Sequence, residues 1–159
     1  MSEFRKRVRI GVIGGNSPDD RSILMAFKVG QLIAESGAIL VCGGMGGVME
    51  AAASGAKHAG GLTVGIIPGT IPAEANQSID LPIATGMGYS RNSLVVMNAD
   101  ALIAIDGEYG TLSEIAYGSI YGKKVIGLET WEVQGVIRAK SPEEAVAIAI
   151  QAGKGLLKE

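Results

Sequence analysis

The feature that most constrains the fold is a unit that recurs along the chain. In each copy, a short apolar run ends in glycines and leads directly into a segment with apolar residues at helical spacing. The glycines of the three clearest copies are Gly14–Gly15, Gly43–Gly47, and Gly107 with Gly110. Short buried strands that alternate with helices indicate right-handed βαβ units and a parallel sheet.

Apolar runs of strand length occur at residues 8–13, 38–42, 62–67, 81–84, 101–105 and 124–128, and a short segment follows at residues 136–138. We therefore predict an α/β fold, a Rossmann-like doubly wound parallel sheet of about six to seven strands with helices on both faces. The 159 residues are expected to form one domain over residues 1–159. The helix after Gly15 is expected to bury the stripe Ile23, Leu24, Phe27, Leu32 and Ile33.

The glycine turns predict a binding site for an anion. All three turns follow strands, so they would lie at the same edge of a parallel sheet, where ligands of such folds bind. Glycine lets the backbone turn sharply and approach a ligand, and a helix N-terminus attracts phosphate or carboxylate. The residues predicted to hold the ligand are Gly14, Gly15, Gly43, Gly44, Gly46, Gly47, Met49, Gly107, Gly110 and Thr111.

Thr111 and Glu114 have two interpretations. Spaced as T-x-x-E before a helical segment, they fit a capping box, in which both side chains only satisfy backbone N–H groups. Alternatively, Glu114 acts on a ligand; beside an anion it would contact a sugar hydroxyl or a proton in transfer. The two interpretations are compatible.

Composition excludes several other kinds of site. Cys42 is the only cysteine and no His/Cys/Asp cluster has metal-ligand spacing, so we expect no disulfide and no protein-held metal. With 14 basic against 16 acidic residues and 4% aromatic residues, the chain is not expected to bind nucleic acid. No apolar run reaches the roughly 18 residues of a membrane span. We expect a cytoplasmic protein without membrane contact.

Two motifs resemble those of the LONELY GUY (LOG) proteins, which often carry the label "possible lysine decarboxylase". Gly43-Gly44-Met45-Gly46-Gly47-Val48-Met49 resembles the family motif G-G-x-x-G-[LV]-M, and residues 107–114 resemble P-G-G-x-G-T-x-x-E. Arg91 matches the family's arginine at a similar spacing from Glu114. The likeness extends from Val8 to about Leu128, and the sequence G-T-L-S-E-I-A is most similar to the molybdenum-cofactor-carrier-like subgroup.

The resemblance implies a Rossmann-like fold, homo-oligomers, and a phosphate-bearing ligand such as AMP or a molybdopterin-type cofactor. Arg91 and Glu114 would be the catalytic pair if the chain is a hydrolase. Arg91 would then orient the phosphate or the base, and Glu114 would stabilise the ribose cation or activate water.

Departures from the hydrolase motifs leave two functions open. Asp106-Gly107-Glu108 stands where the hydrolases have P-G-G, and Asn92 stands where they have lysine. An added carboxylate and a lost cation weaken the binding of a multiply charged anion, which favours a binding protein of the carrier type. The alternative is a nucleoside 5′-monophosphate phosphoribohydrolase, which cleaves the N-glycosidic bond. No stretch supplies the lysine and acidic partner of a pyridoxal-dependent decarboxylase.

Two expectations concern the surface. The segment 68–78 is the longest candidate loop, a length typical of lids and binding loops. The helices after Arg91 and Thr111 are apolar on nearly every face, which predicts a homodimer or homotetramer that buries them. Because Arg91 and Glu114 begin these helices, the pocket is expected close to the subunit boundary.

Overall fold

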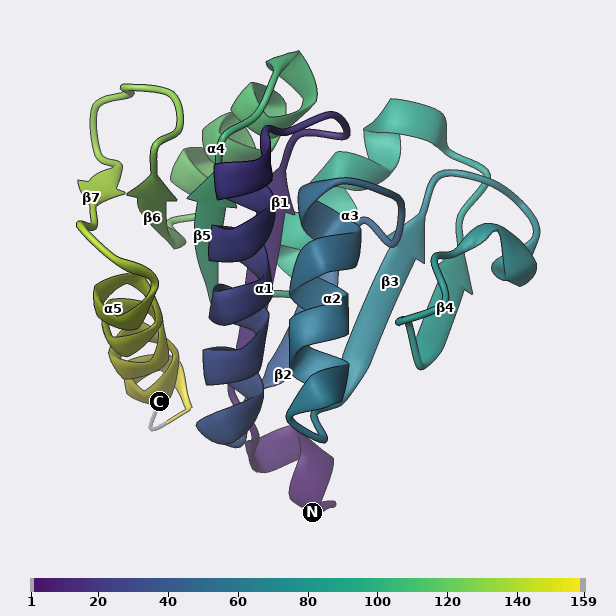
Figure 1. Ribbon diagram of the computed structural model, residues 1–159, viewed down its shortest axis with the longest axis horizontal. Helices are drawn as coiled ribbons and strands as arrows, with labels where there is room; N and C mark the ends of the chain where they lie inside the picture. Colours follow the sequence, from purple (N-terminus) through teal and green to yellow (C-terminus); the bar gives the residue numbers. More distant parts are fainter. Residues whose placement is uncertain (1, 158–159) are drawn as a thin grey trace.

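The computed structural model describes residues 2–157 and has one seven-stranded sheet whose neighbouring strands are all parallel (Figure 1). The strands are β1 (Arg9–Gly14), β2 (Ile39–Cys42), β3 (Thr63–Ile67), β4 (Leu81–Ala84), β5 (Ala101–Ile105), β6 (Lys124–Leu128) and β7 (Ile137–Arg138). Their order across the sheet is β4-β3-β2-β1-β5-β6-β7, so the direction of winding reverses between β1 and β5. The predicted doubly wound α/β fold is confirmed.

Helices cover both faces of this sheet. The α-helices are α1 (Asp20–Glu35), α2 (Val48–His58), α3 (Asn92–Met97), α4 (Tyr109–Ile120) and α5 (Pro142–Leu156). Short 3-10 helices occur at η1 (Glu3–Lys6), η2 (Pro72–Glu74) and η3 (Gly88–Arg91). In Figure 1, α1, α2 and α5 lie in front of the sheet, whereas α3 and α4 lie behind it.

The core follows the alternation of side chains along the strands. In β5, Ile103 and Ile105 pack into the cluster under α1, α2 and α5, whereas Leu102 and Ala104 pack under α3 and α4. Successive strand residues point to opposite faces of a sheet. Since helices cover both faces, every residue of β5 is buried and the run is apolar throughout.

Helices α1 and α2 approach closely through glycine. A Cβ at Gly30 would lie 1.8 Å from the Ala52 carbonyl oxygen, and a Cβ at Gly55 would lie 1.9 Å from that of Phe27. Small residues therefore form much of the buried face of α1, together with Val29 and Ile33. The predicted buried stripe of α1 was wrong for Leu24, whose side chain is exposed. At the contact between α1 and α2, the two backbones approach each other and large side chains do not fill the space between them.

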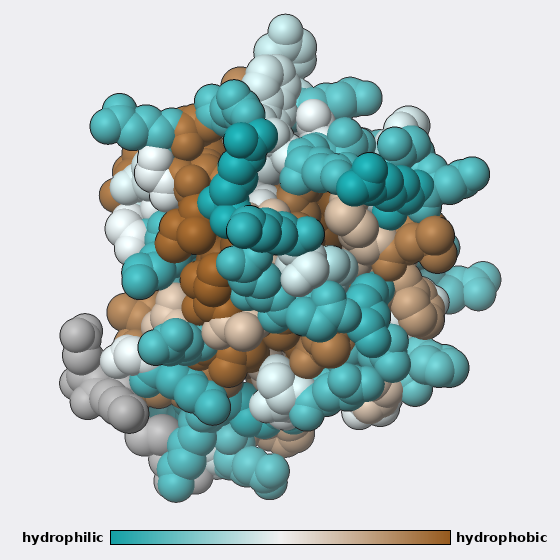
Figure 2. Space-filling view, turned by 60° about the vertical axis from the view of Figure 1, so that its left-hand side comes forward, coloured by the Kyte–Doolittle hydropathy of each residue, from teal (hydrophilic) through white to brown (hydrophobic). Residues whose placement is uncertain are grey.

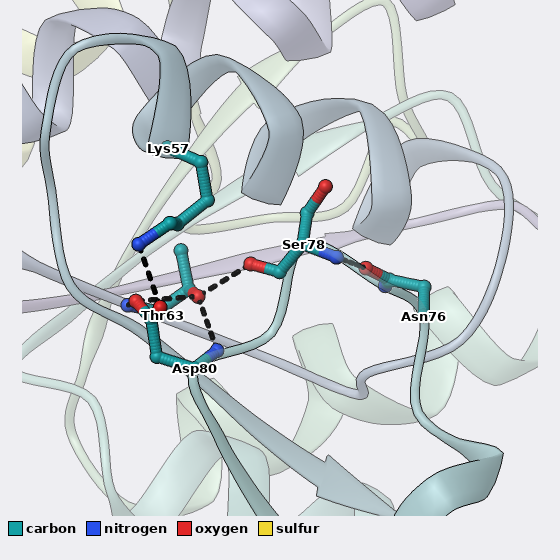
Figure 3. Close-up of polar contacts among 5 residues, drawn as sticks. All are labelled: Lys57, Thr63, Asn76, Ser78 and Asp80. Carbon is teal, nitrogen blue, oxygen red and sulfur yellow. Dashed lines mark hydrogen bonds and ion pairs between the residues drawn. The ribbon is translucent and has the colours of Figure 1, made fainter.

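Polar contacts fix the end of the loop that precedes β4 (Figure 3). Thr63 is fully buried; its hydroxyl donates to the Ser78 carbonyl oxygen at 2.6 Å, and its backbone N–H donates to the Asp80 carboxylate at 3.0 Å. Lys57 forms an ion pair with Asp80 at 2.6 Å. Burial acts to raise the pKa of Asp80, but these hydrogen bonds and the Lys57 charge lower it below its ordinary value.

The same loop is tied to the glycine turn after β2. The Asn76 backbone N–H donates to the Gly44 carbonyl oxygen at 2.9 Å, and its side-chain amide donates to the Met45 carbonyl oxygen at 2.8 Å. Ser78 N–H in turn donates to Asn76 Oδ1 at 3.0 Å. Segment 68–78, expected to be a lid or binding loop, is thus attached to the sheet at its C-terminal end.

Figure 2 turns forward the side of the molecule that carries β7 and α5, where apolar residues form a band bordered by hydrophilic ones. Among residues 2–157, none of the helices combines the length and apolar character needed to cross a bilayer.

Candidate functional site

A pocket of about 430 Å³ opens at the carboxyl ends of β1 and β5. This is the point where the strand order reverses, the usual ligand position in open α/β sheets. Its walls come from the turn after β1, from α2, from the junction of η3 and α3, and from the start of α4. The lining residues are Gly14, Gly15, Asn16, Met49, Tyr89, Arg91, Asn92, Glu108, Tyr109, Gly110, Thr111, Ser113 and Glu114.

The pocket brings together many of the residues predicted from sequence. The predicted residues that line it are Gly14, Gly15, Met49, Arg91, Gly110, Thr111 and Glu114. The predicted residues that do not line it are Gly43, Gly44, Gly46, Gly47 and Gly107. Thus the turns after β1 and β5 line the pocket, and the glycines of the turn after β2 do not.

The turn after β2 contacts the pocket residue Arg91 through Gly43. A Cβ at Gly43 would lie 2.6 Å from Arg91 Nη2, so glycine at this position makes room for the guanidinium. The Gly44 N–H donates at 3.4 Å to the buried Cys42 Sγ, an atom of a residue that does not line the pocket. Burial raises the pKa of the Cys42 thiol to about 12, which leaves it a neutral core group.

Gly107 has a similar supporting role after β5. Its φ is 115°, and an added Cβ would lie 2.5 Å from Thr111 Cβ. The preceding Asp106 has a φ of 51°, which is uncommon for a residue other than glycine. The Thr130 hydroxyl donates to the Asp106 carbonyl oxygen at 2.6 Å and helps to hold this conformation.

Helix α4 begins without a side-chain cap. It starts at Tyr109, and its N-cap residue Glu108 makes no capping hydrogen bond with its side chain. Thr111 is the third residue of the helix, so the capping-box interpretation of Thr111 and Glu114 was wrong. The helix starts earlier because Gly107 makes the turn two residues before it. The first N–H groups of α4 are therefore left without a side-chain acceptor, at the wall of the pocket.

Arg91 is held in place by three hydrogen bonds. Its side chain is only 7% exposed. Nε donates to the Ile66 carbonyl oxygen at 2.8 Å, Nη2 donates to the Gly43 carbonyl oxygen at 3.3 Å, and Nη1 donates to Asn92 Oδ1. A guanidinium has five N–H groups, so one N–H on each terminal nitrogen remains for a ligand. The fork is fixed by the protein and lines the pocket.

Asn92 connects this arginine to α4. It is 2% exposed, and its amide nitrogen donates to Ser113 Oγ at 3.0 Å and to the Gly110 carbonyl oxygen at 3.4 Å. Its amide oxygen accepts from Arg91 Nη1. A lysine has no acceptor and cannot replace these contacts. Asn92, which stands where the hydrolases have lysine, therefore links α3 to α4 at the pocket.

Glu114 faces the pocket with a carboxyl group that accepts no hydrogen bond from residues 2–157. The group keeps some exposed surface toward the pocket, but protein atoms surround it on the other sides. Burial raises its pKa to about 8, and the positive charge of Arg91 opposes that rise. Burial also lowers the pKa of Arg91, opposed by the charge of Glu114. At neutral pH, a carboxyl group with a pKa of about 8 is mainly protonated, so Glu114 does not neutralise the positive charge of Arg91.

Six lining residues are not among the predicted site residues: Asn16, Tyr89, Asn92, Glu108, Tyr109 and Ser113. Of these, Asn92 and Glu108 were noted in the sequence only as departures from the hydrolase motifs. Asn16 and Tyr109 are adjacent in sequence to Gly15 and Gly110, which were predicted to bind the ligand. Their position in the same turns is the sequence signal for these two residues. Tyr89 and Ser113 carry no signal in the sequence. Within residues 2–157, no three His, Cys, Asp or Glu side chains lie close enough together to hold a metal ion.

Proteins of similar sequence include both unassigned proteins and hydrolases. An uncharacterized protein of Archaeoglobus fulgidus is 47% identical over 91% of this chain and 96% of its own length. The cytokinin riboside 5′-monophosphate phosphoribohydrolase of Mycobacterium tuberculosis is 33% identical over 77% of this chain and 71% of its own length.

Solved structures of similar fold include molybdenum cofactor proteins. The molybdenum cofactor binding protein of Rippkaea orientalis superposes with a TM-score of 0.85 at 36% identity, covering 89% of this chain and 94% of that one. The molybdenum cofactor carrier protein of Chlamydomonas reinhardtii superposes with a TM-score of 0.83 at 31% identity, covering 92% and 98%.

The sequence profile of the SLOG cluster4 family matches residues 7–155. The match covers nearly the whole chain and agrees with the LOG resemblance of the two glycine motifs and with the molybdenum-carrier-like fold. The chain belongs to the SLOG cluster4 family.

Proposed function

We propose that this protein binds a phosphorylated small molecule in the pocket between β1 and β5, as a carrier or binding protein of the molybdenum-cofactor type. The phosphate lies between the start of α4 and the side chain of Arg91. The remaining part of the ligand is a nucleoside or a pterin. A volume of about 430 Å³ is within the range of pockets that hold molecules of this size.

The observation that carries the proposal is the pair of unused N–H groups on Arg91. The guanidinium is buried, fixed by three hydrogen bonds and not paired with any carboxylate among residues 2–157. An unpaired buried charge is costly, and a planar fork with two free N–H groups matches two oxygens of a phosphate. A bound phosphate monoester would offset that cost.

The other two helix N-termini near the strand ends are less suited to an anion. The Asp19 carboxylate already caps α1 by accepting from Ser22 N–H at 2.8 Å. That hydrogen bond lowers the pKa of Asp19, so the position is negative at neutral pH. At α2, the Val48 N–H donates to the Gly15 carbonyl oxygen at 3.0 Å. Of these three helices, only α4 has no such acceptor among residues 2–157 for the N–H groups of its first turn. This supports the binding of a phosphate at its start.

The test is calorimetry with AMP, with other nucleoside monophosphates and with molybdenum cofactor. The Arg91→Lys variant keeps a positive charge but loses the fork, and we expect it to weaken binding at least tenfold. Arg138→Lys is the matched control, because Arg138 is exposed and pairs with Glu132 outside this pocket. Equal affinity of both variants for every phosphorylated ligand would contradict the proposal.

Hydrolysis of a nucleoside 5′-monophosphate is a second candidate function, and the state of Glu114 favours it. A carboxyl group with a pKa of about 8 is suited to proton transfer near neutral pH. In this reaction water adds to the anomeric carbon, the carbon–nitrogen bond breaks, and the leaving base takes up a proton. Glu114 would supply or accept the proton, and Arg91 would hold the phosphate.

Incubation with a panel of nucleoside monophosphates, followed by chromatography for the free base, separates the two functions. Base release that is lost in Glu114→Ala would establish the hydrolase. Tight binding of a monophosphate without base release would leave the binding function alone.

A further inference from the structure

Two tyrosine rings at the mouth of the pocket have no role in holding phosphate. Tyr89 comes from η3, and Tyr109 is the first residue of α4. Both line the pocket, and both are 80% exposed. Aromatic residues are scarce in this chain, at 4% of the total, so two exposed rings at one opening call for an explanation.

The Tyr109 ring is supported from outside the pocket by Trp131. Their ring centroids lie 5.8 Å apart with an interplanar angle of 36°, within the range of favourable aromatic pairs. Trp131 is itself fixed, because its Nε1 donates to the Glu108 carbonyl oxygen at 3.1 Å. Trp131 borders a neighbouring hollow and does not line the pocket. The contact therefore backs Tyr109 from the β6–β7 loop and limits how far its ring can move.

The Tyr89 ring also lies close to the start of α4. A Cβ at Gly110 would be 4.0 Å from Tyr89 Cε1, so the edge of this ring is next to the Gly110 backbone. The two tyrosines thus flank Gly110, beside the helix N-terminus proposed to hold phosphate. A ligand with its phosphate at that N-terminus would extend between or against these rings.

We propose that Tyr109, backed by Trp131 and assisted by Tyr89, is a stacking platform for a planar heteroaromatic ring carried by the phosphorylated ligand. This inference rests on the proposed function and specifies the ligand class: the molecule has a flat heterocycle, as a nucleobase or a pterin does, joined to a phosphate group. Every flat heterocycle has a face that can stack on a tyrosine ring. The platform therefore favours ligands with such a ring but does not distinguish one base from another.

The other lining residues favour a ring over an aliphatic group. Met49 is the one aliphatic side chain among them, and the rest are glycines, polar or charged side chains, and the tyrosines. An alkyl chain would gain little contact here, whereas a heterocycle would gain stacking as well as polar partners at its edge. The surface at the pocket mouth thus distinguishes a ring-bearing phosphate from a simple sugar phosphate.

The experiment compares ligands with and without a ring. Calorimetry measures the Kd of AMP, of a pterin monophosphate and of ribose 5-phosphate on the full chain. We expect at least one ring-bearing ligand to bind about tenfold more tightly than ribose 5-phosphate. Tyr109→Ala is expected to remove that difference, because it weakens the binding of the ring-bearing ligands much more than that of ribose 5-phosphate. Tyr109→Phe keeps the ring and is expected to retain the difference.

Tyr121→Ala is the matched control, because Tyr121 is a partly exposed tyrosine at the far end of α4 and does not line the pocket. Trp131 is the only tryptophan, so its fluorescence reports directly on the ring behind Tyr109. A stacked heterocycle is expected to change this emission at saturation, and ribose 5-phosphate is expected to leave it unchanged.

The two proposals fail in different ways. If all three ligands bind with equal affinity, or if Tyr109→Ala leaves the preference intact, the stacking platform is refuted and the phosphate site stands. If none of the three binds to wild-type protein, the proposed phosphate site is refuted, and the stacking proposal falls with it.

Discussion

Glu114 is the residue whose chemistry is most dependent on pH. Its pKa of about 8 means that it gains a negative charge as the pH rises through that value. A phosphate monoester becomes a dianion above about pH 6, so repulsion by an ionised Glu114 would be felt at high pH.

We therefore expect AMP affinity to fall as the pH rises from about 7 to about 9, and Glu114→Gln to remove most of that fall. Calorimetry at fixed ionic strength across this range is the measurement. A wild-type affinity that stays constant across pH 8 would show that Glu114 does not titrate beside the ligand.

The same shift has a consequence for stability with a definite sign. The folded-state pKa of Glu114 is raised from 4.5 to about 8, so between these pH values the native protein binds more protons than the unfolded chain. The contribution of Glu114 to the free energy of unfolding is most favourable below pH 4.5 and declines as the pH rises toward 8. Chemical denaturation of wild type and Glu114→Gln should therefore diverge in this interval, with wild type losing stability relative to the variant.

Asn92 is predicted to be a positioning residue. Asn92→Asp removes the amide N–H groups that donate to Ser113 and Gly110, and it places a carboxylate against Arg91. We expect the free energy of unfolding to fall by about 1–3 kcal/mol and AMP affinity to fall with it.

Asn98→Asp is the control for this change. Asn98 directly follows the same helix, α3, and donates to the Leu94 carbonyl oxygen at 2.8 Å in an exposed position. Water replaces that contact, so we expect little change in stability or binding. Equal effects in both variants, measured by denaturation and calorimetry, would exclude a special role for Asn92.

The contact between α1 and α2 depends on glycine at the positions where the two helices approach most closely. Gly30→Ala would place a methyl group 1.8 Å from the Ala52 carbonyl oxygen, so the helices must separate. We expect the free energy of unfolding to fall by about 3 kcal/mol, as for overpacked cores.

Gly155→Ala makes the same change near the end of α5, where an added Cβ meets no atom within 4 Å. Because alanine favours helix over glycine, this variant should be unchanged or more stable by about 0.5 kcal/mol. Denaturation curves of the two variants decide the matter, and similar stabilities would mean that the helices adjust freely.

Homo-oligomerisation of the chain stays a prediction. Its basis is the apolar surface on the side of the sheet that carries α3 and α4. Met97 and Ile120 are exposed on these helices, and Tyr121 is exposed directly after α4. On the same side, an apolar hollow of about 500 Å³ is lined partly by Val64, Ile66, Leu81 and Ile83. Exposed apolar area of this kind is typical of subunit contacts.

Light scattering of the purified chain is expected to give a dimer or tetramer, and Ile120→Glu is expected to shift it toward monomer. Leu24→Glu is the control, because Leu24 and Ile120 are both 71% exposed but lie on opposite faces of the sheet. A monodisperse wild-type monomer at micromolar concentration would refute the prediction.

Local sequence patterns predict the fold class, the strands and the edge of the sheet that carries the pocket. These follow from local rules: apolar runs of strand length form buried strands, and glycines at strand ends allow the turns that lead into helices. Arg91 and Glu114 were also identified from sequence, although through motif resemblance and not through periodicity.

Contacts between distant segments determine which glycine turns line the pocket. They also determine the roles of supporting residues such as Asn76, Asn92 and Trp131. The glycines of the turn after β2 do not line the pocket: Asn76, distant in sequence, donates to the carbonyl groups of Gly44 and Met45, and Arg91 fills the space beside Gly43. The role of Asn92 and the support of Tyr109 by Trp131 also depend on residues that meet only in the folded chain. Local patterns encode backbone conformation, whereas burial, pKa and side-chain partners are set by contacts between segments far apart in sequence.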